Sequence, residues 1–432
     1  MSTKRLAVCL ALSAWGSALL AQQGAAPPPG PGGVLTLEAA IDEALASNLQ
    51  LAAEKRNISV AETQEITARL RPNPVLTVSG QTLNLLGAQF NPNTPLGPNQ
   101  ANVHTDLPIE RGGKRQSRMA YAAAEREAAG LGVRELTRRV VFAVESAYVD
   151  VQLAKANLAL AQQNLEYLQN VVRVNQARLA SGDLAQVELD RSQIAALQYA
   201  TAVDEARLQL EQSKTQLRLL IGRTQPGAPI EVDDRFRSDA LSVSEPEIAR
   251  LAFDRRPDLL LDQQAKVRSQ ADLRLQLANG KVDYSIGAEY THQRAWGIGG
   301  SSVGLYFSMP LPLFNRNQGE IARAEQEIAL AGARVAAANA EVAAEVEKAY
   351  REYEVSRTLL ANVETNMLAK ARAVRETTEY SYRRGEATLV EFLDAQRAFN
   401  DTMQTYNAAR AGYARSLYQI DSVSGATAAS TN

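Results

Sequence analysis

The stretches ARLASGDLAQVELDRSQ, residues 177–193, and YSYRRGEATLVEFLDAQ, residues 380–396, follow one pattern. The positions that they share are Gly182/Gly385, Asp183/Glu386, Val187/Val390, Glu188/Glu391 and Gln193/Gln396. The two copies lie about 200 residues apart, a spacing that indicates duplication of a domain-sized unit rather than a short solenoid repeat. We therefore expect two similar halves in the chain.

The amino-terminal residues have the parts of a secretory signal peptide. A basic pair, Lys4 and Arg5, precedes an apolar run that ends at Leu20. We expect residues 1–21 to be removed on export, together with Cys9, the single cysteine of the chain. The mature protein would then have no disulfide and no cysteine metal ligand. The formal net charge of -2 shows no basic excess of the kind that suggests nucleic-acid binding.

Long proline-free tracts favour long helices. Prolines are absent from residues 109–225 and 313–432. An interior proline costs a helix about 3 kcal/mol, so helices in these tracts can far exceed the usual ~11 residues. Apolar residues recur every seven positions at Val144, Val151, Leu158, Leu165, Val172 and Leu179, and again at Val346, Tyr353, Leu360, Met367 and Val374. Such heptads predict helices that pack as coiled coils, the first of them from about Lys114 to Leu179.

The repeated glycines predict the ends of these helices. Glycine readily adopts the left-handed conformation that ends a helix, and Asp183 or Glu386 suits the start of the next one. Each repeat is therefore expected to hold a long antiparallel helical hairpin, with its tip near Gly182 or Gly385.

Four segments between the helices alternate in polarity with the period of a strand. They are residues 74–83, 101–108, 281–292 and 301–310. In the third, Val282, Tyr284, Ile286, Ala288 and Tyr290 alternate with polar or small residues. We expect the polar faces to line water and the apolar faces, with Tyr284, Tyr290, Trp296 and Phe307, to meet lipid.

Four such strands cannot close a barrel alone, because the smallest bacterial membrane barrels have about eight. No run of about 18 apolar residues follows the signal peptide, so no transmembrane helix is expected. The expected fold class is mainly α with a membrane β-barrel part. In it, a duplicated helix-strand-strand-helix repeat contributes four strands per protomer to a trimeric twelve-stranded barrel, and a long α-helical coiled-coil tunnel continues the barrel.

The expected organisation has six parts. These are the signal peptide (residues 1–21), a Pro/Gly-rich segment (22–35), the first repeat (36–225), a linker or equatorial segment (226–245), the second repeat (246–424) and a tail (425–432).

Three groups of motifs carry a family resemblance. They are LTLEAAIDEALASNLQL at 35–51, the Pro257-Asp258 pair, and RRGEATLVEFLDAQ at 383–396. The chain resembles the outer membrane efflux proteins of the TolC family, in which a glycine precedes a V-D-x-L-D-A pattern; here Glu391 replaces the first aspartate. IERGGKRQSRMAYA at 109–122 and PLPLFNRNQGEIARAE at 310–325 are similar to the cobalt-zinc-cadmium, or heavy-metal RND, branch.

The resemblance implies a homotrimer in the outer membrane, in contact with its lipid, with a helical tunnel in the periplasm. It implies two further partners, a periplasmic adaptor protein and an inner membrane RND-type pump. The pump would set most of the substrate specificity. No cofactor, resident metal or nucleic acid is expected.

The resemblance also implies site residues. Glu391 and Asp394 would form an acidic ring at the periplasmic gate, with Glu188 and Tyr382 near a latch. The family's basic latch partner falls on Ala387, so Arg383 or Arg384 would have to substitute for it, or the latch is absent. The expected adaptor contact at the hairpin tips comprises Arg178, Leu179, Gly182, Arg384 and Gly385.

Other functions remain open at this point. An enzyme is disfavoured, because His104 and His292 are the two histidines of the chain and no phosphate-loop or nucleophile-elbow motif occurs. A soluble periplasmic coiled-coil scaffold would share the heptads. An adaptor would carry one hairpin rather than two. Within the family, drug efflux and type I secretion are alternatives to metal efflux.

Overall fold

The computed structural model describes residues 34–81, 99–225, 229–295 and 298–426 of the chain. The expected signal peptide and Trp296 lie outside the described residues. The elements are α1 (Leu37–Ser47), α2 (Leu49–Arg69), β1 (Val75–Gln81), β2 (Asn99–Ile109), α3 (Lys114–Ala180), α4 (Gln186–Leu220), α5 (Glu245–Arg255), α6 (Pro257–Asn279), β3 (Tyr284–Ala295), β4 (Ile298–Ser308), α7 (Gln318–Asn362), the π-helix η1 (Val363–Met367), α8 (Leu368–Arg384) and α9 (Leu389–Val423). The predicted helix-strand-strand-helix unit thus occurs twice.

The four strands form one antiparallel sheet in the order β1-β2-β3-β4, so β2 of the first repeat pairs with β3 of the second. Val103 lies opposite Tyr290, and Tyr290 lies opposite Val303. Because side chains alternate between the faces of a sheet, these residues share one face and Asn102 and Thr291 share the other. Exposed apolar residues of the first face also include Leu76, Val78, Leu107, Ile286, Leu305 and Phe307. One face is therefore apolar, as the alternation predicts.

The bounds of all four strands differ from the sequence prediction by a few residues, and the start of β3 and the end of β4 have a physical reason. β3 begins at Tyr284, because the carboxylate of Asp283 is held by the Arg111 backbone N–H at 2.8 Å and by Lys114 Nζ at 2.6 Å. These contacts tie Asp283 to the turn before α3. β4 ends at Ser308 because Pro310 has no N–H with which to continue a ladder.

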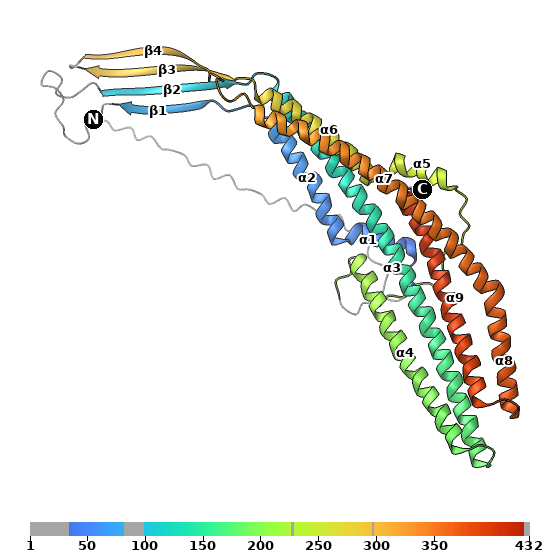
Figure 1. The fold of residues 1–432 in the computed structure, drawn as a ribbon. Coiled ribbons are helices and arrows are strands. Elements are labelled where there is room, and N and C mark those ends of the chain that lie inside the picture. Colours follow the sequence, from blue (N-terminus) through green and yellow to red (C-terminus); the bar gives the residue numbers. More distant parts are fainter. Residues whose placement is uncertain (1–33, 82–98, 226–228, 296–297, 427–432) are drawn as a thin grey trace, which may run out of the picture.

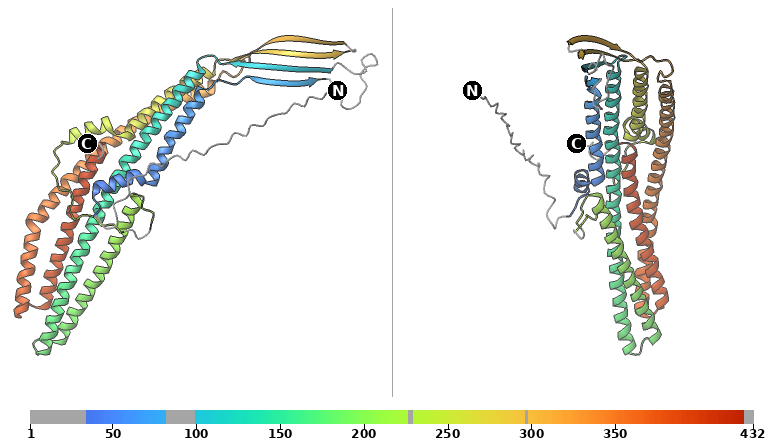
Figure 2. Two further views of the ribbon diagram at one scale, coloured as in Figure 1. Left: turned by 180° about the vertical axis from the view of Figure 1, so that it is seen from behind. Right: turned by 90° about the vertical axis from the view of Figure 1, so that its left-hand side faces the viewer.

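Figure 1 shows the sheet at one end of an elongated protomer and two hairpin tips at the other. Beside the sheet, α2 packs on α3, α3 on α6 and α6 on α7. Nearer the tips, α4 packs on α3, α3 on α9, and α9 on α7 and α8. The protomer is therefore one layer of elements with two open edges along its length (Figure 2). Within the ranges described above, none of the helices has the length and apolar character that a membrane span needs.

The longest helix, α3, has 67 residues and spans about 100 Å at 1.5 Å per residue. Its bounds agree with the heptad prediction. Val144 and Val151 are fully buried in its seam, where Ala147 and Ala154 let neighbouring helices approach closely. Intrinsic helix propensity alone does not stabilise such a helix. The packing contacts along this seam supply the rest of its stability.

The second long helix differs from the heptad prediction because it is interrupted by η1. A π-helical turn inserts extra backbone and rotates all later side chains around the axis. Val346 and Tyr353, before the interruption, are buried, whereas Met367 and Val374 of the same heptad series are exposed. The predicted apolar stripe therefore leaves the intramolecular seam at η1 and continues on an open edge.

The segment between the repeats packs against the middle of the protomer. The backbone N–H of Leu35 donates to the Glu231 carbonyl at 2.7 Å, and Leu35 and Val232 form a parallel bridge. The hydroxyl of Tyr148 on α3 donates to the Leu35 carbonyl at 2.8 Å. These bonds attach Leu35, which precedes the first repeat, and the segment between the repeats to α3.

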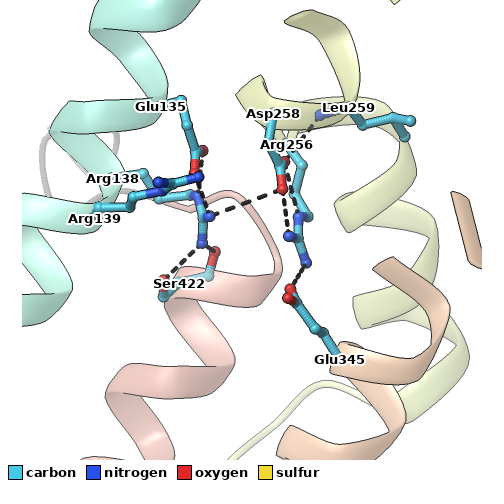
Figure 3. A network of polar contacts seen from close by, with 8 residues as sticks. All are labelled: Glu135, Arg138, Arg139, Arg256, Asp258, Leu259, Glu345 and Ser422. Carbon is cyan, nitrogen blue, oxygen red and sulfur yellow. Dashed lines mark hydrogen bonds and ion pairs between the residues drawn. The ribbon is translucent and has the colours of Figure 1, made fainter. Parts of the chain in front are cut away.

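Arg256, at the start of α6, lies at the centre of an ion-pair network in this middle region (Figure 3). It is 2% exposed, and it lies 2.5 Å from Asp258 Oδ2 and 2.6 Å from Glu345 Oε2 on α7. Asp258 lies 4.0 Å from Arg138 on α3, which donates to the carbonyl and hydroxyl oxygens of Ser422 on α9. The network thus joins α3, α6, α7 and α9.

Replacing Arg256 tests the importance of this network. Arg256→Met leaves the carboxylates of Asp258 and Glu345 without their buried cation. We expect the free energy of unfolding to fall by about 2 kcal/mol, because the arginine is buried but both carboxylates keep access to water, so the loss is that of hydrogen bonds to charged groups. Chemical denaturation of the detergent-purified protein, followed by circular dichroism, measures it.

The matched control is Arg250→Met on α5, whose ion pair with Asp254 is exposed. We expect this variant to lose less than about 1 kcal/mol. Equal losses in the two variants would contradict a special role for Arg256.

Candidate functional site at the hairpin tips

Both hairpin tips end their first helix in the same way. At the first tip, Gly182 N–H donates to the Leu179 carbonyl at 3.0 Å and Asp183 N–H to the Arg178 carbonyl at 2.8 Å. At the second, Gly385 N–H donates to Tyr382 at 3.0 Å and Glu386 N–H to Ser381 at 2.9 Å. These pairs form the Schellman motif, which requires a left-handed residue. Gly182 and Gly385 supply it, with φ angles of 83° and 79°.

The helices that follow the tips begin differently. Thr388 and Glu391 form a reciprocal capping box at the start of α9, in which Glu391 Oε2 accepts from the Thr388 N–H at 2.7 Å and from its hydroxyl at 2.9 Å. These bonds, the backbone one foremost, lower the pKa of Glu391 below its usual range. In the first repeat Ala185 replaces the threonine, so Glu188 at the start of α4 has no such hydroxyl. Glu391 therefore has a structural role that the family pattern did not indicate.

Asp394 lies one turn further along α9. Its side chain is 66% exposed and lies 3.5 Å from Nη1 of Arg397. Residues three apart on a helix lie on neighbouring parts of its surface. Glu391 and Asp394 therefore lie on neighbouring parts of the α9 surface, but the Glu391 carboxylate turns back to Thr388 whereas the Asp394 carboxylate faces Arg397.

Tyr382 is buried and connects the two tips. Its hydroxyl donates to Asn175 Oδ1 on α3 at 2.8 Å, and its ring stacks on Phe392 at 5.1 Å between centroids. The guanidinium of Arg178 lies over the same ring at 5.9 Å, and a Cβ at Gly385 would lie 3.8 Å from Arg178 Nη2. Arg178 of the first tip thus contacts the second tip directly.

The other predicted residues occupy separate places. Arg383 pairs with Glu379 at 2.6 Å and Arg384 lies over the Tyr380 ring at 4.6 Å. Both of these basic residues therefore interact within α8. Burial raises the pKa of Tyr382. Glu188 is half-buried in the first turn of α4. Leu179 is half-buried in the last turn of α3.

Sequence analysis missed a series of side-chain amides between α3 and α9. Asn407 donates to Asn157 Oδ1 at 3.0 Å, and Gln396 to Asn164 Oδ1 at 3.0 Å. Asn164 donates in turn to Asn400 Oδ1 at 2.7 Å. Asn157 and Asn164 are seven residues apart, which is the heptad spacing. Polar residues that recur at this spacing within an apolar seam are the sequence signal that could have predicted these hydrogen bonds. Together with Tyr382 and Asn175, this amide series holds the two hairpins together with uncharged hydrogen bonds.

No group of three His, Cys, Asp or Glu residues suited to a metal ion occurs in the part of the chain that the structure describes. The acidic residues at the tips are thus separate carboxylates on a helix surface.

The Tyr382–Asn175 bond can be tested by removing one hydroxyl group. Tyr382→Phe keeps the stack on Phe392 but leaves the buried Asn175 oxygen unpaired, at a cost of about 1–3 kcal/mol. We expect faster amide hydrogen exchange in residues 167–180 and 380–396. Tyr380→Phe, on an exposed face of α8, is the matched control and should leave exchange unchanged. Unchanged exchange in both variants would show that the bond does not hold the tips together.

Comparisons with known proteins agree with this architecture. A family model described as outer membrane efflux protein matches residues 40–223 and 249–426. The cobalt-zinc-cadmium resistance protein CzcC of Cupriavidus metallidurans is 24% identical over 386 residues, which are 87% of this chain and 88% of that protein.

Solved structures show the same fold. CusC, whose crystal structures concern folding and transmembrane channel formation, has a TM-score of 0.75 at 17% identity, covering 90% of this chain and 92% of its own. The CmeC outer membrane channel of Campylobacter jejuni has a TM-score of 0.75 at 15% identity, with coverages of 90% and 85%. Since the family model matches both repeats, this chain belongs to the outer membrane efflux protein family and is an efflux channel of the outer membrane.

Proposed function

We propose that this protein is the outer membrane conduit of a tripartite system that exports heavy-metal cations. In this proposal an inner membrane RND-type pump and a periplasmic adaptor deliver the cations to it. The observation that carries the proposal is the similarity to a cobalt-zinc-cadmium resistance protein over most of both chains. The channel itself is passive, and the pump selects the substrate.

The open edges of the protomer favour a homotrimer. β1 and β4 are the edges of the described sheet, and an unpaired strand edge is not tolerated in lipid. The two edges differ, so copies join head to tail and close a ring if the rotation permits. Three copies supply twelve strands. The repeats, residues 36–225 and 246–424, each contribute two strands and one hairpin.

Apolar stripes on the outer helices support the same closure. α4 and α8 lie on opposite sides of the protomer (Figure 1). Exposed apolar residues follow α4 at Val187, Leu197 and Leu208, and follow α7, η1 and α8 at Val355, Leu359, Met367 and Val374. Joining unlike edges would bury one stripe against the other. From η1 onward Met367 and Val374, which belong to the heptad series that is buried at Val346 and Tyr353, are exposed as well.

The tips have the features of a gate and a docking end. In a trimer, three copies of Glu391 and Asp394 would make a negative constriction that favours cations. Glu188, Tyr382, Arg383 and Arg384 would lie around it. Gly182 and Gly385 are exposed, and they lie in the turns from α3 to α4 and from α8 to α9. Figure 1 shows these turns at the end furthest from the sheet. With Arg178, Leu179 and Arg384, they form the surface that we propose for the adaptor.

Deletion of the gene tests the substrate class. We expect the lethal concentrations of zinc, cobalt and cadmium to fall and those of organic toxicants to stay the same, because the conduit serves a metal pump. Growth assays with and without a plasmid copy of the gene measure both. Unchanged metal tolerance with new sensitivity to drugs would contradict metal efflux and favour the drug-efflux alternative.

The gate proposal requires a variant that separates charge from helix capping. Glu391→Gln with Asp394→Asn removes both charges, while glutamine still accepts the capping bonds. We expect divalent-cation block of single channels to weaken by about tenfold, the lower end of the effect expected for a cleft lined by one charge sign. Planar-bilayer recording measures it.

Thr388→Ala is the complementary control. It breaks the capping box but keeps both carboxylates, so cation block should resemble that of the wild type. Equal cation block in the charge variant and the wild type would contradict the proposal that Glu391 and Asp394 form the constriction.

A further inference from the structure

A cavity of about 600 Å³ lies where the sheet meets the helices. Its walls are Arg71 and Pro72 after α2, residues 107–110 at the end of β2, and residues 113–116 at the start of α3. The GGKR turn at 112–115, noted in the sequence as a family motif, therefore forms one side of a cavity far from the proposed gate.

The charges around this cavity are not balanced. Lys114 pairs with Asp283 at 2.6 Å, and Glu110 pairs with Arg118 at 2.5 Å. Arg115 donates through Nε to the Arg69 carbonyl at 2.7 Å. Within the described ranges, neither Arg71 nor Arg115 forms an ion pair. Two guanidinium groups therefore line the cavity without an acidic partner.

The cavity is continuous with the apolar face of the sheet. Leu107 both lines the cavity and lies on that face, where it is exposed. Val103 lies four residues away along β2, on the same face and opposite Val78 of β1, and both Val103 and Val78 are exposed. An apolar strip thus leads from the cavity along the strands.

We propose that this cavity binds the phosphate headgroup of a membrane phospholipid. Arg71 and Arg115 would hold the phosphate, whose oxygens match the planar fork of a guanidinium group, and the acyl chains would lie along Leu107, Val103 and Val78. The proposal rests on the sheet spanning the outer membrane. The headgroup would belong to the leaflet nearer the helices.

A second occupant competes for the same cavity. The turn after β4 exposes Leu311, Leu313 and Phe314, the last at 89%, and in a trimer it would lie near the next protomer's β1 edge. Apolar side chains would cover Arg71 and Arg115 without supplying an anion, and burying unpaired charge is unfavourable. Charge complementarity therefore favours the phospholipid.

Native mass spectrometry of the full-length protein, purified from outer membranes in mild detergent, tests the site. Phosphatidylglycerol is the probe, and diacylglycerol, which lacks phosphate, is the control lipid. We expect Arg71→Gln with Arg115→Gln to weaken phosphatidylglycerol binding about 30-fold, which is about 2 kcal/mol or about 1 kcal/mol per arginine. Diacylglycerol should bind weakly and equally to both proteins. The single variant Arg71→Gln, at an exposed position, should weaken binding about fivefold and covers the case in which the double variant fails to assemble.

The matched control is Lys370→Gln with Arg372→Gln, which removes two exposed cations from α8 and should bind phosphatidylglycerol like the wild type. Wild-type binding by the Arg71/Arg115 variant would overturn the site. A fall in its trimer dissociation temperature with unchanged lipid binding would instead assign the cavity to the neighbour's turn. Absence of the protein from outer membranes would reject the proposed function itself, a separate result.

Discussion

The junction between the two repeats is the interaction on which the rest of the protomer depends. β2 pairs with β3 along eleven residues from Asn99 to Ile109, and α3 packs on α6 near the sheet and on α9 near the tips. Each repeat buries an apolar cluster of its own, around Val144 and Val151 in the first and around Val346 and Tyr353 in the second, but a strand pair or a helical hairpin still leaves much of its apolar surface exposed. The junction therefore turns two incomplete units into one curved layer.

The junction uses different chemistry along its length. Backbone hydrogen bonds join the strands, the Arg256 and Arg138 ion pairs join four helices in the middle, and side-chain amides join α3 to α9 toward the tips. Amide pairs lack the large desolvation cost of buried charges. The region nearest the proposed gate is thus joined by uncharged hydrogen bonds, ending at the Tyr382–Asn175 bond, together with the contact of Arg178 with the Tyr382 ring. No ion pair between α3 and α8 or α9 is found there among the described residues.

Regular features of the chain were predictable because they arise from local rules. Heptads and the absence of proline predicted α3, and the positive φ angles of Gly182 and Gly385 explain why both glycines end helices. The π-helix was not predictable, since the heptad series continues through Met367 and Val374 with no break in polarity. Within it Val363 is fully buried and η1 packs against α9, a contact between distant segments that no local pattern records.

The candidate site at the tips also has features that the sequence predicts and features that it does not. The family resemblance indicated Glu391, Asp394 and Tyr382, but it could not show that Glu391 caps α9 or that Tyr382 bonds to Asn175, a residue 207 positions away. The sequence by itself determined the duplication, the long helices, the alternating strands and the family. The tertiary structure alone decided which polar side chains meet, because contacts between α3 and α9 depend on how two helices from different repeats are aligned. Periodicity specifies a helix face, whereas that alignment follows from the packing of the whole junction.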